Sequence, residues 1–81
     1  MSAILILTIF PDQESAEKVA EKLVDRELIA CANIIRIENS IYRWKGKTEK
    51  HSEYLMLAKT KMKAYAQTEL FIKQNHPAEV P

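Results

Sequence analysis

This sequence has few of the residues that mark specialised small proteins: one cysteine, one glycine and three prolines. The single cysteine, Cys31, excludes an intrachain disulfide and a zinc site built on CxxC pairs. The scarcity of glycine and proline excludes collagen-like repeats and low-complexity linkers. A reducing compartment is the simplest expectation for such a chain, and we expect a cytoplasmic protein.

The net charge is also low, and the apolar runs are short. Twelve basic and eleven acidic side chains give a net charge of +1, so neither nucleic acid nor a membrane is expected as a partner. The longest apolar run, residues 3–10, is interrupted by Thr8. A membrane-spanning helix needs about 20 apolar residues. The run also lacks the basic segment and the cleavage site of a signal peptide.

The remaining composition is that of a globular domain. Of 81 residues, 47% are hydrophobic and 28% are charged, and we expect one domain over residues 1–81. A domain near this size buries only about 60% of the surface that its unfolded chain exposes. Its own core therefore gives a small margin of stability.

The first part of the chain predicts a strand and then a helix. Residues 3–10 are apolar and rich in β-branched side chains, which predicts a central strand buried on both faces or covered by partners. Pro11 ends this strand, and Asp12 is a suitable helix N-cap. From residue 13 to about residue 28, apolar side chains recur at helical spacing, which predicts one buried stripe on an amphipathic helix.

The middle of the chain predicts a long β-hairpin. Residues 31–44 and 48–60 are rich in β-branched, aromatic and other apolar side chains. Lys45-Gly46 between them is a candidate two-residue turn in which glycine supplies a positive φ. Asn39-Ser40 interrupts the first strand and predicts a bulge.

A second helix is expected over residues 61–75, ended by His76-Pro77, because a residue that precedes proline disfavours helical geometry. Five side chains of this segment are expected to face the sheet: Met62, Tyr65, Ala66, Leu70 and Ile72.

The order strand, helix, strand, strand, helix predicts an α+β, ferredoxin-like βαββαβ fold. Its fourth strand would begin near Val80 and pair beside residues 3–10. The final strand is then largely absent from residues 1–81, and we expect a C-terminally incomplete domain. The alternative is that another chain covers the exposed edge strand.

Three side chains are candidates for chemistry. Cys31 fits a small apolar role better than catalysis, because no base accompanies it. His51 is expected to be solvated, with a metal or proton-switch role open together with Glu49 or Glu53. His76 fits a helix C-terminus, and ligation of a metal is its alternative role.

Aromatic side chains cluster near the hairpin tip at Tyr42 and Trp44, beside Arg43. A core of this size has no room for them, so we expect a contact between subunits. Stacking on a ligand and simple exposure are the alternatives.

Five stretches together strongly resemble the CutA divalent-cation tolerance family: Pro11-Asp12, residues 30–35, residues 40–47, Lys59-Thr60 and residues 76–81. The resemblance implies a ferredoxin-like subunit, a tight homotrimer in which long strands of neighbouring subunits pair, and a role in tolerance to divalent metals, notably copper. It also implies a protein that is not an enzyme.

The resemblance also implies candidate ligands for a divalent cation, Cu(II) or another. His76 occupies one ligand position of some bacterial members. Thr8 stands where those members have a cysteine, and Asn75 stands where they have another histidine. A Cu(I) site without its thiolate is disfavoured.

Two other functions stay open. One is a signalling or small-molecule sensor trimer similar to PII proteins, with Tyr42, Arg43, Trp44 and Lys59 as candidate ligand contacts. The other is a structural assembly module whose partner gives the function.

Overall fold

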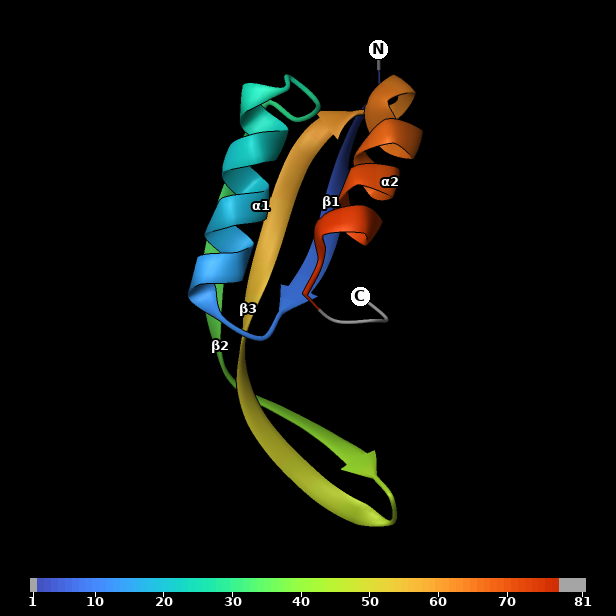
Figure 1. Cartoon of the computed structure of the whole chain (residues 1–81). Helices are drawn as coiled ribbons and strands as arrows, with labels where there is room; N and C mark the ends of the chain where they lie inside the picture. The colour runs from blue at the N-terminus through green and yellow to red at the C-terminus, as the bar shows by residue number, and fades with distance from the viewer. Residues whose placement is uncertain (1, 78–81) are drawn as a thin grey trace.

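The computed structural model describes residues 2–77. Three strands form one antiparallel sheet in the order β1-β3-β2, and two helices accompany them (Figure 1). The elements are β1 (Ala3–Phe10), α1 (Gln13–Asp25), β2 (Cys31–Trp44), β3 (Lys47–Lys61), the short 3₁₀ helix η1 (Met62–Ala64) and α2 (Tyr65–Asn75). This is the α+β, ferredoxin-like arrangement that the sequence predicts. The expected start of a fourth strand near Val80 lies outside the described residues.

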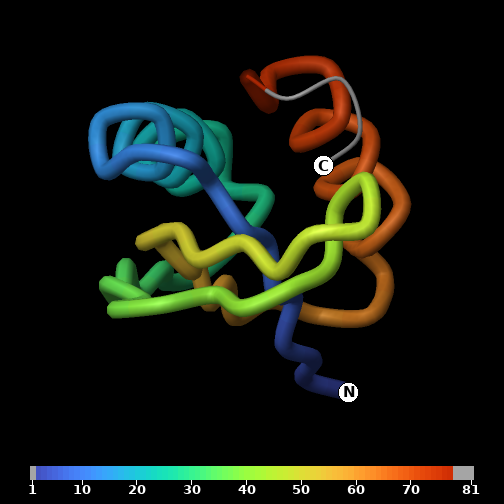
Figure 2. The backbone as a smooth tube through the Cα atoms, turned by 90° about the horizontal axis from the view of Figure 1, so that it is seen from below, coloured from blue at the N-terminus to red at the C-terminus, as the bar shows by residue number. Residues whose placement is uncertain are grey.

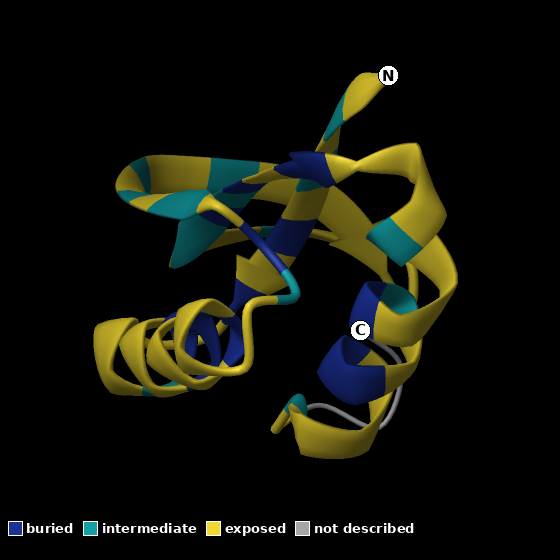
Figure 3. Cartoon of the chain, turned by 90° about the horizontal axis from the view of Figure 1, so that it is seen from above, coloured by how far each residue is buried: buried dark blue, intermediate teal, exposed yellow. Residues whose placement is uncertain are grey.

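Both helices lie on the same side of the sheet, as the view from below shows (Figure 2). The buried residues lie on the two helices and on the strands that the helices cover (Figure 3). Hydrophobic collapse of this layer is the main stabilising term. The core consists of Phe10, Ala16, Val19, Ala20, Leu23, Ile29, Met56, Ala58, Phe71 and Ile72.

The sequence predicts β1 as a central strand that is buried on both faces or covered by partners, and as a bare edge without the fourth strand; among the described residues the bare edge is found. There β1 lies at the edge of the sheet and pairs only with β3. Its side chains alternate between the covered face, where Phe10 is buried, and the other face, where Leu7 is 63% exposed. An apolar run can therefore reflect one buried face and one uncovered apolar face.

Helix α1 begins as predicted and ends earlier. The Asp12 carboxylate accepts a hydrogen bond from the Ser15 backbone N–H at 2.7 Å, which makes Asp12 the N-cap. The helix ends at Asp25 because Glu27 takes a positive φ of 58°. The Leu28 N–H then bonds back to the Leu23 carbonyl at 3.0 Å, which closes the helix end.

The hairpin matches the sequence prediction closely. Lys45 and Gly46 form the two-residue turn, with φ values of 50° and 77°, as this tight turn requires. The register of β2 against β3 shifts between Ile37 and Ser40, which confirms the expected bulge. Beyond that shift, residues 40–51 project past the helices; we call this segment the arm (Figure 1).

The buried face of α2 is only partly the predicted one. Ile72 is buried, but Met62, Tyr65, Ala66 and Leu70 are exposed. The side chains that pack inward are Thr68, Phe71 and Ile72. The helix begins only at Tyr65, after η1, and its inward stripe includes a threonine, which a search for apolar periodicity passes over.

Thr68 can take a core position because its hydroxyl donates to the backbone carbonyl of Leu28 at 3.3 Å. Thr60 on β3 donates to the same oxygen at 2.7 Å. One carbonyl in the loop after α1 thus joins that loop to β3 and α2. Buried hydroxyls are tolerated where they have such partners.

Replacing Thr60 or Thr68 by valine removes one hydroxyl and keeps nearly the same shape. We expect each single change to lower the free energy of unfolding by about 0.5–1.5 kcal/mol. The double variant is expected to lose more than the sum of the single losses, because only that variant deprives the Leu28 carbonyl of both hydroxyls. Urea unfolding followed by circular dichroism measures the three values.

Thr48→Val is the matched control, because Thr48 lies exposed on the arm and should change stability by less than about 0.5 kcal/mol. Strictly additive losses in the double variant would show that the two hydroxyls do not share one acceptor energetically.

Candidate functional site

The uncovered face of the sheet carries a cluster of apolar side chains. Three of them, Leu5, Leu7 and Ile9, come from β1 and are 61%, 63% and 38% exposed. The strand register continues this row across the sheet, because Ile9 pairs with Leu55 and Leu55 with Ile35. We call this surface the open face; it consists of Leu5, Leu7, Ile9, Ile35, Leu55 and Leu57. Contiguous exposed apolar surface of this kind marks an interaction site.

The predicted interface residues lie on the arm and are exposed, Trp44 at 60% and Tyr42 at 43%. The bulge decides the side to which they belong. Ser40 pairs with His51 and Tyr42 with Glu49, and those β3 residues alternate in phase with Leu55. Because paired residues share a face, Tyr42 and Trp44 lie on the same side of the hairpin as the open face. Their role in subunit contact stays a prediction.

Two contacts involve the aromatic rings of the arm. The rings of Tyr42 and His51 stack with centroids 5.7 Å apart. The Lys45 ammonium lies 5.8 Å from the centroid of the Trp44 ring, which is a favourable cation–π geometry. His51, one of the candidate chemical residues, is exposed here and engaged with an aromatic ring.

A groove of about 310 Å³ follows the outer edge of β1 beside α2. Side chains from both faces of β1 line it, with Ile72 from the helix. A ladder on α2 borders it: the Tyr65 hydroxyl donates to Glu69 Oε2 at 2.6 Å, and the Lys73 ammonium lies 3.6 Å from Glu69 Oε1. The hydrogen bond from Tyr65 to Glu69 raises the pKa of Tyr65. The same bond, together with the positive charge of Lys73, lowers the pKa of Glu69. The i, i+4 spacing of this ladder is visible in the sequence but was not part of the sequence prediction.

His76 ties the end of α2 to the end of β1. Its backbone N–H donates to the Ile72 carbonyl at 2.8 Å, so it caps the helix as the sequence indicates. Its ring stacks on Phe10, with centroids 4.4 Å apart. Nε2 lies 2.6 Å from the Ile9 carbonyl oxygen. A carbonyl only accepts, so Nε2 carries the proton of this hydrogen bond.

At the positions that the sequence suggests, hydrogen bonds already engage His76 and Asn75, and metal ligation by His76 stays a prediction. A metal needs an unprotonated ring nitrogen, so a cation at His76 would have to bind Nδ1, because Nε2 donates to Ile9. The Asn75 side-chain amide donates to the Phe71 carbonyl at 2.8 Å, and Thr8 offers only a hydroxyl and is 8% exposed. Within residues 2–77, no three His, Cys, Asp or Glu side chains come together in a way that could hold a metal.

The two remaining candidates lie away from His76. Cys31 is half-buried at the start of β2 and has a free thiol, opposite Lys59 of β3. Glu49 and Glu53 flank His51 along β3, in the arm and beside it. In residues 2–77, neither helix is long and apolar enough to cross a membrane.

Comparison with known proteins gives the family. The chain matches the CutA1 divalent ion tolerance protein family over residues 4–81. It belongs to that family. The resemblance seen in the sequence motifs is confirmed, and the CutA1 fold accounts for the ferredoxin-like subunit.

Two relatives are similar over nearly the whole chain. The divalent-cation tolerance protein CutA of Thermococcus kodakarensis is 42% identical over 81 residues, which is 100% of this chain and 77% of the relative. The CutA protein of Pyrococcus horikoshii is 42% identical over 78 residues, covering 96% of this chain and 76% of the relative.

A solved CutA1 structure agrees with the fold. The crystal structure of the divalent ion tolerance protein CutA1 from Ehrlichia chaffeensis superposes with a TM-score of 0.94 at 29% identity. The match covers 99% of this chain and 75% of that one.

His76→Ala tests whether this side chain binds a metal or holds the fold together. We expect the free energy of unfolding to fall by about 1 kcal/mol, because the bond to Ile9 is lost. Isothermal titration with Cu(II) and with Zn(II) should give the same heats for the wild type and the variant.

The control is His51→Ala, which removes the exposed histidine of the arm and leaves the Ile9 contact in place. A binding heat that persists in His51→Ala and disappears in His76→Ala would contradict this assignment and make His76 a metal ligand.

Proposed function

We propose that this protein acts in divalent-cation tolerance, copper among the cations, as a non-enzymatic homotrimer. The observation that carries the tolerance role is the match to the CutA1 family over residues 4–81. The relatives from Thermococcus and Pyrococcus carry the same function in their names. That name describes tolerance to ions and no reaction, which supports a role without catalysis.

Trimer formation is supported by the open face. A small domain gains stability by covering such an apolar surface, and identical copies do so in closed rings. Tyr42 and Trp44 extend the same side of the sheet into the arm, 60% of Trp44 being exposed. Aromatic side chains of this kind are enriched at interfaces.

The positions of the reactive side chains support a role other than catalysis. Cys31 begins β2, His51 lies on the arm, and His76 ends α2 and is bonded to Ile9. Nucleophilic catalysis needs a nucleophile and a base within hydrogen-bond reach. We therefore propose that the tolerance function depends on the assembly and not on a reaction at these side chains. For His76 we propose a role in holding α2 to β1 through its bond to Ile9, without tight coordination of a cation.

The tolerance proposal is tested by growth. In a bacterial strain that lacks its own CutA1-family gene and is sensitive to Cu(II) or Zn(II), expression of this chain should restore growth. His76→Gln, which can still donate a hydrogen bond, should restore growth to a similar extent. Cell fractionation of the same strain tests the proposed cytoplasmic location.

Growth that stays as sensitive as with an empty vector, although the protein is soluble and trimeric, would refute the tolerance role. Restoration by the wild type and failure of a stable His76→Gln variant would instead place the cation at that residue.

The assembly is tested by size-exclusion chromatography with light scattering. We expect a trimer for the wild type at micromolar concentration. Leu7→Glu should give monomers, because it places a charge in the middle of the open face. Trp44→Ala should weaken the trimer by removing the largest exposed ring of the arm.

Leu70→Glu is the matched control, because Leu70 is 56% exposed on α2, away from the open face. A monomeric wild type, or equal loss of assembly in Leu70→Glu, would contradict the proposed interface. Retained assembly in all variants would favour a different surface.

A further inference from the structure

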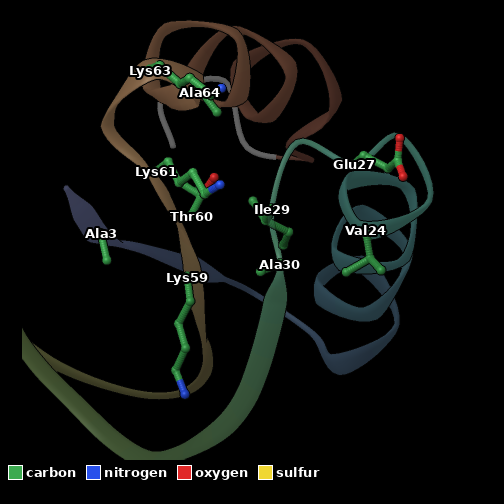
Figure 4. Close-up of a pocket in the computed structure, with 10 residues that line it drawn as sticks. All are labelled: Ala3, Val24, Glu27, Ile29, Ala30, Lys59, Thr60, Lys61, Lys63 and Ala64. Carbon is green, nitrogen blue, oxygen red and sulfur yellow. The ribbon is translucent and has the colours of Figure 1, made fainter. Parts of the chain in front are cut away.

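A cavity of about 630 Å³ lies at the end of the sheet, between the last turn of α1 and η1. Its volume is within the range of about 300–1,000 Å³ that small-molecule sites occupy. The residues around it come from the start of β1, the last turn of α1 and the loop after it, the end of β3, and η1 (Figure 4). They are Ala3, Val24, Glu27, Ile29, Ala30, Lys59, Thr60, Lys61, Lys63 and Ala64.

The inner wall of this cavity is apolar and held in place by hydrogen bonds. Ile29 is buried and lies in the middle of the group, with Val24 facing it from α1 (Figure 4). Thr60 is fixed through its hydroxyl bond to the Leu28 carbonyl. The Ala30 N–H also donates to the Lys59 carbonyl at 2.8 Å. A wall fixed in this way is preorganised for a ligand.

The rim is mainly cationic. Lys59, Lys61 and Lys63 line the cavity, against one carboxylate, that of Glu27. Lys61 and Lys63 approach from the β3–η1 side, opposite Val24 and Glu27, whereas Lys59 extends away along the sheet (Figure 4). Glu27 owes its left-handed backbone, with φ of 58°, to the closure of the end of α1.

We propose that this cavity binds a small organic anion with an apolar body. The apolar part would lie on Ile29 and Val24, and its carboxylate, sulfonate or phosphate group would lie near Lys61 and Lys63. Apolar walls with a few charged groups that set orientation are typical of ligand sites. The site shares no residue with the open face or with His76, so it is independent of the cation-tolerance proposal. Such a site would also support the small-molecule sensor alternative.

The test uses 1-anilinonaphthalene-8-sulfonate as probe and N-phenyl-1-naphthylamine, the same body without its sulfonate, as comparison. Both are titrated into the full chain labelled with ¹⁵N, and amide shifts locate the binding. We expect the sulfonate probe to shift amides of residues 24–30 and 59–64, and to bind there more tightly than the neutral compound.

Lys61→Glu and Lys63→Glu should each raise the dissociation constant measured at those amides by about three- to tenfold. Lys59→Glu should have a smaller effect, because its side chain extends away. Lys18→Glu, the same charge change on the exposed surface of α1, should leave binding unchanged. Circular dichroism and urea unfolding confirm that each variant is folded.

Three results would overturn the proposal. The first is the absence of saturable shifts at residues 24–30 and 59–64. The second is equal affinity of the neutral compound at these residues, which would mean that the lysines contribute nothing. The third is binding confined to the open face, with shifts only at residues 5–9 and 55–57. Inorganic phosphate is titrated in a separate experiment. Saturation by phosphate at the same affinity would show an anion site without the apolar contact.

Discussion

Both helices pack against one face of a three-stranded sheet, and the other face keeps its apolar side chains exposed. Crossover connections between parallel strands are right-handed, which places α1 on a fixed side, and α2 joins it there. This single-sided packing leaves the second apolar face of β1 uncovered in the subunit, with Leu5 and Leu7 more than half exposed. It is the surface that the proposed assembly would bury.

Local chemistry in the sequence was enough to predict most of the elements. Proline after β1, an acidic N-cap, and a Lys-Gly turn each act over a few residues, so they can be recognised without tertiary information. The bulge near Asn39-Ser40 was recognisable for the same reason. The order of the elements then predicted the ferredoxin-like topology, and the family motifs agreed with it.

Features that depend on distant residues could not be predicted. Thr68 is buried because Leu28, forty residues away in the chain, offers a carbonyl, and no local pattern contains that partner. The exposed positions of Tyr65 and Leu70 follow from the same choice of helix face. His76 is similar: the resemblance to the family suggested a metal ligand, but its contact with the Ile9 carbonyl arises only when the end of α2 meets the end of β1.

The bulge in β2 has a consequence for how this hairpin tolerates change. Glu38 and Asn39, within the shifted stretch between Ile37 and Ser40, are both exposed. Their side chains therefore have little influence on packing, and the bulge accommodates the one extra residue of β2 between the pairs Ile37–Glu53 and Ser40–His51. With one residue fewer, the two strands would pair without a bulge, and Tyr42 and Trp44 would stay on the side of the open face. A bulge bends its strand and increases the local twist, so the extra residue sets the direction in which the arm leaves the sheet.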